Sequence, residues 1–543
     1  MVSAIQAFLQ KHPALLFLIP YSALLIFLGL EDGVLQVDEG GDTFVATTIL
    51  KYGFPMHSDG INATMPFADI YEGLFIYRTW LPYYLQALSI AVLGHTTFAA
   101  RFPFALIGLA SIIALYFLTL RLIEKKSAAF LSSLFLASSV PALLYFRTAR
   151  YVGLPVLLTI LLLFFYIRIF ADRQWKPAPF IITAILYFHS MYVAFAGLIL
   201  GILIHFLIHR KRIRPENARQ VMTCVVWIGC FTLPWLMAIF PVFANITGFY
   251  ADVSDLVDNS VWGYFKHLAG YLFQINNYIF PFIPLPLIFS EKLNPFKPQI
   301  QLLLICTLTV LLAASSLSIP LQQYIAAALP LLYILLAMIV TERLPGKVAL
   351  QSIAAALLIV TNLIHVGPLL PFKNLIQEKK GWFRHSLYWQ YAARTFTREI
   401  QLSSVLSRHI YQISHPYKGP LDAVVEFFKT HGKPGQSCYI DNESESLVYY
   451  TGLKLIAKEQ LHPGNPPDWI VLRGDQRFLY KPDKLSRTLQ TLIQPSRYRE
   501  IVLNAPAWRI NNSYDIQLHR FRSPDFPDRV LIYQRLEPPS SNL

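Results

Sequence analysis

Two adjacent carboxylates, Asp38 and Glu39, follow closely on the first hydrophobic stretch of the chain, residues 14–30. Charged groups at the edge of a lipid bilayer are costly, so their presence there points to a function. A carboxylate that faces a water-filled cavity can act as a general base on an incoming hydroxyl. The alternative is structural: Asp42, one helical turn after Asp38, would cap a helix that starts at Thr43. Position alone leaves both interpretations open, and Asp38 and Glu39 are the candidate catalytic residues.

Arginines on the same predicted face could complement such a base. They are Arg78, Arg101, Arg147 and Arg150. A guanidinium group binds phosphate through two hydrogen bonds and keeps its charge, which suits a reaction that expels a phosphate. For any single arginine, the alternative is a side chain that reaches out to lipid headgroups. This alternative explains Arg147 and Arg150 less well, because they interrupt a pattern that puts basic residues on the opposite face.

Three further side chains are expected on this face. Tyr151 follows Arg150, His189 occupies the tip of a predicted hairpin, and Tyr324 lies at the start of the tenth predicted span. Each could line a substrate cavity, although a histidine at a helix end can also be purely structural. We predict that Arg78, Arg147, Arg150 and these three residues bind substrate. The sequence predicts no metal-binding residues.

The composition is that of a polytopic membrane protein. Of 543 residues, 55% are hydrophobic and 14% are charged, and the mean hydropathy is +0.44. Apolar stretches recur as far as about residue 370, each long enough to cross a hydrocarbon core of about 30 Å. The net charge of +14 could suggest nucleic acid. The basic residues cluster in short loops between spans, however, so we expect no nucleic-acid binding.

The predicted topology has eleven spans with the N-terminus in the cytoplasm and the C-terminal region outside, because basic residues mark the cytoplasmic loops. Basic flanks on both sides of residues 178–208 predict a hairpin with His189 at its tip, rather than one long helix. Residues 80–93 are predicted to lie in the membrane interface without crossing it. The predicted spans are 14–30, 98–120, 127–145, 152–169, 178–191, 193–208, 221–243, 268–290, 300–318, 321–341 and 348–367.

The chain divides into three predicted regions. Residues 1–370 form a transmembrane catalytic domain with a large first external loop, 31–97; residues 371–415 form a membrane-proximal linker; and residues 416–543 form an external α/β domain. Alternating elements predict the α/β domain. Its helices are expected at 421–431, 444–450 and 483–493, and its strands at 437–440, 468–472, 498–503 and 529–533.

Several short segments in a fixed order resemble a known group of proteins. They are Asp38-Glu39, residues 93–103 (LGHTTFAARFP), residues 147–151 (RTARY) and residues 323–330 (QYIAAALP). In this order they are similar to the membrane glycosyltransferases of the GT-C fold, in the family 39 and RgtA/B/C/D-like group. That group includes protein O-mannosyltransferases and the aminoarabinose transferase of lipid A. The resemblance covers roughly residues 10–370.

The resemblance implies an inverting transferase that moves a sugar from a polyprenyl-phosphate carrier to a hydroxyl of a glycan, lipid or protein. It implies Asp38 as the base, with Glu39 beside it, in a plasma or inner membrane whose lipids surround the bundle. Many relatives carry a second acidic residue after the third span, where this chain has Arg150 and Tyr151. Arg78 is the candidate for the basic residue that contacts the lipid phosphate. No cofactor is certain, and a divalent cation is left open.

Two alternatives to a transferase are a transporter or lipid-sugar flippase and a scaffold without catalysis. The sequence shows no internal repeat and no matching pair of broken spans, which many transporters have. The carboxylates also lie at the membrane edge and not in mid-span. A scaffold would leave the external charges unexplained. The sequence identifies neither the sugar nor the acceptor.

Overall fold

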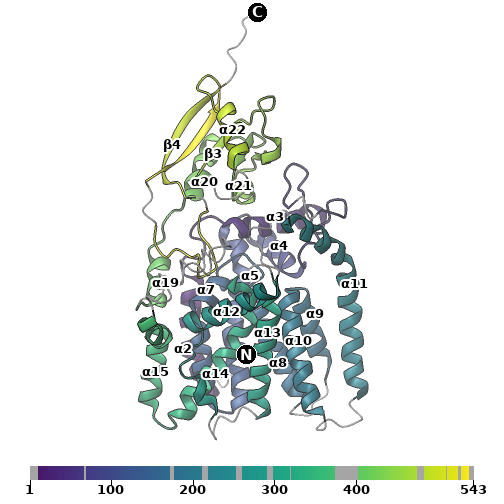
Figure 1. Cartoon of the computed structure of the whole chain (residues 1–543), viewed down its shortest axis with the longest axis vertical. Coiled ribbons are helices and arrows are strands. Elements are labelled where there is room, and N and C mark those ends of the chain that lie inside the picture. The colour runs from purple at the N-terminus through teal and green to yellow at the C-terminus, as the bar shows by residue number, and fades with distance from the viewer. Residues whose placement is uncertain are drawn as a thin grey trace, which may run out of the picture.

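A bundle of helices carries a small sheet domain at one end (Figure 1). This computed structural model describes residues 10–65, 69–170, 176–210, 218–251, 260–289, 297–317, 320–372, 402–473, 482–508, 510–523 and 527–536. The bundle core is built from buried leucine, isoleucine, valine, alanine and aromatic side chains of most of its helices. The apolar stretches of the sequence therefore pack against one another, as expected for a multi-pass helical protein.

The helices of the bundle follow the predicted spans. They are α2 (Ala14–Phe27), α5 (Thr97–Ile123), α6 (Lys126–Ser138), α7 (Val140–Phe146), α8 (Gly153–Phe170), α9 (Ala178–Phe188), α10 (Tyr192–Ile208), α11 (Ala218–Ala251), α12 (Val261–Tyr278), α13 (Pro298–Ser315), η6 (Gln322–Ala328), α14 (Leu329–Arg343) and α15 (Val348–Val360). Among the described residues, four helices are long and apolar enough to cross a membrane, or up to six spans if two bent pairs are included. Five shorter apolar helices accompany them. The count of eleven stays a prediction.

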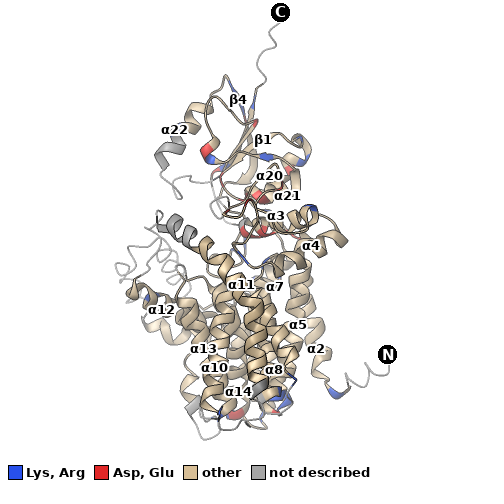
Figure 2. Cartoon of the chain, turned by 90° about the vertical axis from the view of Figure 1, so that its right-hand side faces the viewer, with Lys and Arg blue, Asp and Glu red and all other residues tan. Residues whose placement is uncertain are grey.

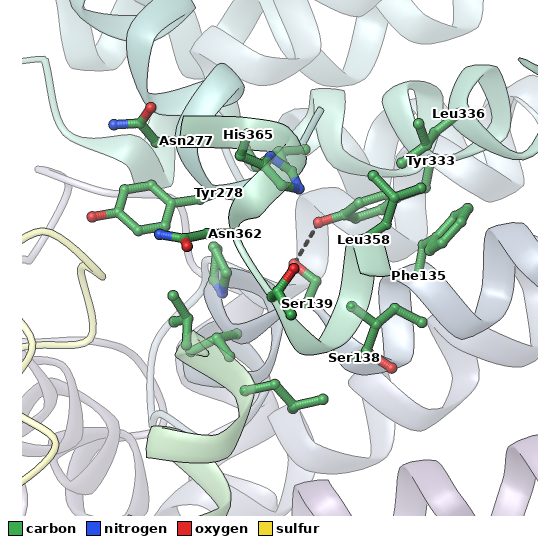
Figure 3. A pocket seen from close by; sticks show the side chains of 17 residues that line it. Phe135, Ser138, Ser139, Asn277, Tyr278, Tyr333, Leu336, Leu358, Asn362 and His365 are labelled. Atoms are coloured by element: carbon green, nitrogen blue, oxygen red, sulfur yellow. Dashed lines mark hydrogen bonds between the residues drawn. The ribbon is translucent and has the colours of Figure 1, made fainter. Parts of the chain in front are cut away.

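Two predicted spans are broken helices. α6 and α7 meet at 66°, and α15 meets the segment that begins with α16 (Leu363–Val366) at 77°. The first break lies at Ser139, which is extended and accepts a hydrogen bond from the Ala142 backbone. Both breaks line one cavity of about 60 Å³ (Figure 3). There the Tyr333 hydroxyl donates to Ser139 Oγ at 2.7 Å, so a polar pair bridges α14 to the break.

The eighth predicted span, 268–290, is wrong in its bounds. Helix α12 begins earlier, at Val261, and ends at Tyr278; the chain continues into the short 3-10 helix η5 (Leu285–Phe289). Three prolines between residues 281 and 286 explain the early end, because proline lacks the N–H that a helix interior needs.

The hairpin prediction is confirmed, since α9 and α10 are separate helices joined at residues 189–191. Two helices of the predicted first external loop, α3 (Val37–Tyr52) and α4 (Leu81–Leu93), lie across the end of the bundle that faces the sheet domain (Figure 1). Within the bundle, lysine and arginine are concentrated at the opposite end, and others lie in the sheet domain (Figure 2). This distribution agrees with the predicted interfacial position of α4 and with an external first loop.

The C-terminal region contains a mixed five-stranded sheet of order β2-β1-β3-β5-β4. β1 pairs in parallel with β2 and β3, whereas β5 runs antiparallel to β3 and β4. All predicted helices and strands occur here, and β2 was not predicted. The elements are α19 (Val405–Ser414), α20 (Pro420–His431), β1 (Ser437–Ile440), α21 (Ser444–Thr451), β2 (Lys454–Leu455), β3 (Trp469–Leu472), α22 (Pro482–Leu492), β4 (Tyr498–Pro506) and β5 (Arg529–Arg535). Most of the predicted linker, residues 373–401, lies outside the described residues.

The sheet domain docks directly on α3. The Asp422 carboxylate accepts a hydrogen bond from the Val34 backbone at 2.8 Å, just before α3 begins. At Gly40, an added Cβ would come within 2.7 Å of the Ser446 backbone nitrogen on α21. Glycine therefore allows the close approach of α3 and α21 that fixes the domain above the acidic residues.

Candidate active site

Helix α3 presents the acidic residues because of how it begins. The Gln36 backbone donates to Glu39 Oε2 at 3.0 Å, and acidic side chains in the first turn favour a helix start at this point. Asp38 and Asp42 lie one turn apart, hence on one face. The alternative in which Asp42 caps a helix at Thr43 is wrong, because α3 already starts at Val37.

Glu39 lies on another face of α3 and is fully buried, with 0% of its side chain exposed. Its two oxygens accept from Nε and Nη2 of Arg101, each at 2.9 Å, and Oε1 also accepts from the Ala149 backbone at 2.8 Å. Arg101 in turn donates to the carbonyls of Leu30 and Asp32. The pair thus joins α3, α5 and the loop after α7, and this geometry is that of a structural ion pair.

Asp38, Asp42, Arg78 and Arg150 form one ionic cluster. Arg150 Nη1 lies 2.6 Å from Asp38 Oδ2, and its Nε lies 3.1 Å from Asp42 Oδ2. Arg78 Nη1 donates to Asp42 Oδ1 at 2.5 Å. Arg150 and Asp42 are buried, whereas 40% of the Asp38 side chain is exposed. Of the four groups, Asp38 is therefore the most accessible from outside the protein.

Aromatic rings surround the two guanidinium groups. Arg150 lies over the rings of Tyr151 and Tyr514, at 5.1 and 4.9 Å from their centroids. Arg78 lies 5.8 Å from the centroid of Tyr151. Tyr324, at the start of η6, is near enough to Tyr151 and both arginines to interact with them electrostatically. Of the predicted binding residues, the structure therefore brings together Arg78, Arg150, Tyr151 and Tyr324 around Asp38.

One residue of the cluster, Tyr514, was missed by the sequence analysis. It comes from the loop between β4 and β5 of the sheet domain, and its hydroxyl donates to Asp38 Oδ2 at 2.7 Å. The two residues are 476 positions apart. No local pattern in the sequence signals such a contact.

The charges around Asp38 determine its protonation. Burial alone would raise the pKa of the Asp38 carboxyl, but the positive charges of Arg150 and Arg78, together with the Tyr514 hydrogen bond, hold that pKa below its usual range. Burial also opposes the charge of Arg150, yet Asp38 and Asp42 raise its pKa well above the usual value. Asp38 is thus ionised at neutral pH.

Arg147 and His189 have other partners. Arg147 donates to the carbonyls at residues 25, 26, 28 and 29, at and just beyond the end of α2. Burial, with the nearby charge of Arg101, lowers the pKa of Arg147 to about 10. His189 Nε2 contacts the Phe231 carbonyl of α11 at 3.2 Å. The sequence analysis grouped both residues with the substrate-binding set, and the structure gives them contacts that support helix ends and helix packing.

A second cavity, of about 110 Å³, lies between the end of α2, α19 and the β4–β5 loop. Arg147, His409, Tyr514 and His519 are among its lining residues. Within the described ranges, no three or more His, Cys, Asp or Glu side chains are grouped as a metal site.

The class of protein follows from this fold and site together with two comparisons. Residues 78–237 match the family model described as dolichyl-phosphate-mannose-protein mannosyltransferase. This match covers part of the chain; together with the structural similarity described next, it shows the GT-C fold that the sequence resemblance predicts. No curated protein matches the chain in sequence.

The structure is similar to that of ArnT from Cupriavidus metallidurans. In complex with undecaprenyl phosphate, that protein aligns with a TM-score of 0.57 at 14% identity, over 95% of this chain and 97% of that chain. Its apo state aligns with a TM-score of 0.58 at 14% identity and the same coverage. The oligosaccharyltransferase AglB from Archaeoglobus fulgidus aligns at 14% identity over 91% of this chain and 69% of that chain, with a TM-score of only 0.44.

Proposed function

We propose that this protein is an inverting glycosyltransferase that moves a sugar from a polyprenyl-phosphate carrier to the hydroxyl of a glycan, lipid or protein acceptor. The observation that carries the proposal is Asp38: an accessible, ionised carboxylate beside two arginines at the end of a GT-C-fold bundle. ArnT, with the same fold, binds undecaprenyl phosphate. A lipid phosphate and a base are the two groups that this chemistry requires.

In the proposed step, the acceptor hydroxyl oxygen attacks the anomeric carbon of the donor sugar. The bond from that carbon to the phosphate oxygen breaks, and its electron pair leaves with the polyprenyl phosphate. The hydroxyl proton passes to Asp38. Because phosphate is a good leaving group, no general acid is needed, and a single displacement inverts the anomeric configuration. A positioned base contributes about 10²–10⁴-fold to the rate of such a step.

The low pKa of Asp38 makes it a weak base until the donor binds. We infer that the lipid phosphate competes with Asp38 for Arg150 and Arg78. A guanidinium that turns toward the phosphate withdraws part of its charge from Asp38, and the carboxylate becomes more basic. Donor binding would thereby activate the base, and the same arginines would stabilise the charge of the leaving phosphate.

The other predicted site residues take supporting roles in this proposal. Tyr151 holds both arginines through its ring, and Tyr324 lines the site beside it. Glu39 positions α3 through Arg101 and does not touch the substrate. Arg147 and His189 hold the helices that border the site.

The setting that we propose is a plasma or inner membrane, with eleven crossings, a cytoplasmic N-terminus and the sheet domain outside. In this proposal the crossings are the long helices, the two bent pairs, the shorter apolar helices other than α4, and α12. The concentration of lysine and arginine at the end of the bundle away from the sheet domain supports this orientation (Figure 2).

Purified protein in vesicles tests the proposal with polyprenyl-phosphate sugars that carry a radiolabel on the sugar. A transferase or its hydrolytic side reaction cleaves the donor, so the label leaves the lipid and polyprenyl phosphate is released. A transporter or flippase would move the intact lipid-linked sugar across the vesicle membrane without cleavage. Transport with an uncleaved donor would overturn the proposal.

A further inference from the structure

The geometry around Asp38 points to a role for the sheet domain in the reaction. We propose that Tyr514 is a positioning residue, which fixes the Asp38 carboxylate so that one of its oxygens faces the acceptor hydroxyl. The sheet domain would then supply part of the active site in addition to any contact with the acceptor. This inference rests on the proposed transferase function.

The loop that carries Tyr514 is anchored on both sides of the residue. On one side, the Asn511 backbone donates to Glu443 Oε1 at 2.8 Å inside the sheet domain. On the other side, Asp515 Oδ2 accepts from the Gln322 backbone of η6 at 3.1 Å. Tyr514 itself is only 5% exposed. Contacts to the sheet domain and to the bundle thus hold the ring of Tyr514 in the site.

Tyr514 makes two separable contacts there. Its hydroxyl donates to Asp38 Oδ2 at 2.7 Å, and its ring packs 4.9 Å from the guanidinium of Arg150. Arg150 Nη1 approaches the same oxygen of Asp38, at 2.6 Å. With Oδ2 held from two directions, the carboxylate cannot rotate freely about its Cβ–Cγ bond. Oδ1 is then the oxygen that takes the proton.

Docking of the domain does not depend on this hydroxyl. Other hydrogen bonds also join the sheet domain to the rest of the chain. Among them, the Val34 backbone donates to the Asp422 carboxylate at 2.8 Å, and the hydroxyls of Thr97 and Tyr450 lie 2.7 Å apart. The hydroxyl of Tyr514 can therefore be removed while the domain stays in place. This makes the positioning role open to a direct test.

The test compares Tyr514→Phe with Tyr417→Phe. The first change keeps the ring over Arg150 and removes only the hydroxyl on Asp38. Tyr417 serves as the matched control, because its hydroxyl donates to the Arg520 carbonyl at 3.0 Å and accepts from Asn512 at 2.9 Å, so it holds the same loop without contacting Asp38. kcat, KM for a polyprenyl-phosphate sugar, and the pH profile of kcat are measured for the wild type and both variants.

We expect kcat of Tyr514→Phe to fall about 10- to 100-fold, the range for loss of a hydrogen bond to a charged group, with little change in KM. The acid limb of its profile should shift to higher pH, because the lost hydrogen bond helps the charges of Arg150 and Arg78 to lower the pKa of Asp38. The remaining charged group of the cluster, Asp42, is paired with both arginines and is unchanged in this variant. Tyr417→Phe should match the wild type in all three measurements.

Two results would overturn the inference. If Tyr514→Phe keeps the wild-type kcat and pH profile, its hydroxyl does not position Asp38. If both variants lose activity equally with an unchanged acid limb, the loop matters only for docking. Wild-type turnover is the reference in the same assay, so these results differ from failure of the proposed function, in which the wild type itself cleaves no donor and both proposals fall.

Discussion

Glu39 and Arg101 form a two-pronged ion pair, with both carboxylate oxygens 2.9 Å from guanidinium nitrogens and the carboxylate fully buried. Asp38 comes one position before Glu39 on α3. Its side chain is 40% exposed and lies 2.6 Å from Arg150 in the candidate active site. Two adjacent acidic residues of one helix turn thus have different tasks. One joins the helix to the bundle, and the other is available for chemistry.

Glu39→Gln should therefore act mainly on stability. The change leaves the Arg101 charge buried without a carboxylate, which costs about 3–5 kcal/mol when one partner of a buried pair is removed. Thermal unfolding in detergent should show a melting temperature several degrees lower than that of the wild type. Asp38→Asn, at a partly exposed position, is the control and should unfold close to the wild type. Equal melting temperatures for Glu39→Gln and the wild type would contradict the structural role of the pair.

Arg150→Lys tests whether the planar guanidinium matters or only its charge. A lysine cannot contact Asp38 and Asp42 at once while stacking between Tyr151 and Tyr514, as Arg150 does. We expect kcat/KM to fall about 10²–10³-fold, the usual loss when one charge-stabilising donor is removed.

The control for Arg150→Lys is Arg535→Lys, at an exposed position where the guanidinium lies 3.7 Å from Asp468 and makes no contact with the Asp38 cluster among the described residues. It should leave turnover unchanged. Wild-type kcat/KM in Arg150→Lys would show that a point charge suffices.

Which arginine enters the site could not be predicted from the sequence. Arg147 and Arg150 are three positions apart in one motif, yet the first binds the end of α2 and the second binds Asp38. The turn between α7 and α8 decides this, and its course depends on tertiary packing. The contact of Tyr514 with Asp38 could not be predicted either, because it forms only when two distant regions of the chain pack together.

The helices and strands, by contrast, follow from local patterns. Apolar stretches predict nearly every helix of the bundle, and the alternation of helical and strand segments predicts four of the five strands. The errors also have local causes. The prolines after residue 280 end the eighth span early, and β2 has only two residues, too few to show a pattern. The acidic residues at 38 and 42 and the candidate arginines were visible in the sequence, whereas the choice of Arg78 and Arg150 as partners, and the contact with Tyr514, needed the fold.

Asp515→Asn should change how stability depends on pH. Burial raises the pKa of the Asp515 carboxyl to about 6, whereas an unfolded aspartate has a pKa of about 4. The folded state therefore binds a proton that the unfolded state has already lost, and wild-type stability falls as pH rises from about 4 to 6. A shift of about two units corresponds to about 3 kcal/mol.

Asparagine does not bind or release this proton, so the stability of the Asp515→Asn variant should not fall over this pH range. Melting temperatures of both proteins, measured from pH 4 to 8, give the difference between them. We expect the melting temperature of the variant, relative to that of the wild type, to rise from about pH 4 to about pH 6 and then to stay constant. A difference that is the same at every pH would contradict the raised pKa of Asp515.

Removal of divalent cations should leave turnover unchanged. Arg150 contacts both Asp38 and Asp42, and Arg78 occupies the other oxygen of Asp42, so the carboxylates that could bind a cation are engaged by guanidinium groups. Initial rates are compared before and after treatment with EDTA and after addition of Mg²⁺ or Mn²⁺. A loss of activity that either metal restores would show that a cation takes part in the reaction.

The central claim is that Asp38 takes the proton from the acceptor. The most direct test is the rate at which purified Asp38→Asn releases polyprenyl phosphate from a labelled donor in the presence of acceptor, with Glu426→Gln, an exposed carboxylate on α20, as the matched control. We predict a rate at least about 10²-fold below the wild type for Asp38→Asn, an unchanged rate for the control, and similar melting temperatures for all three. A wild-type rate in Asp38→Asn would contradict the account.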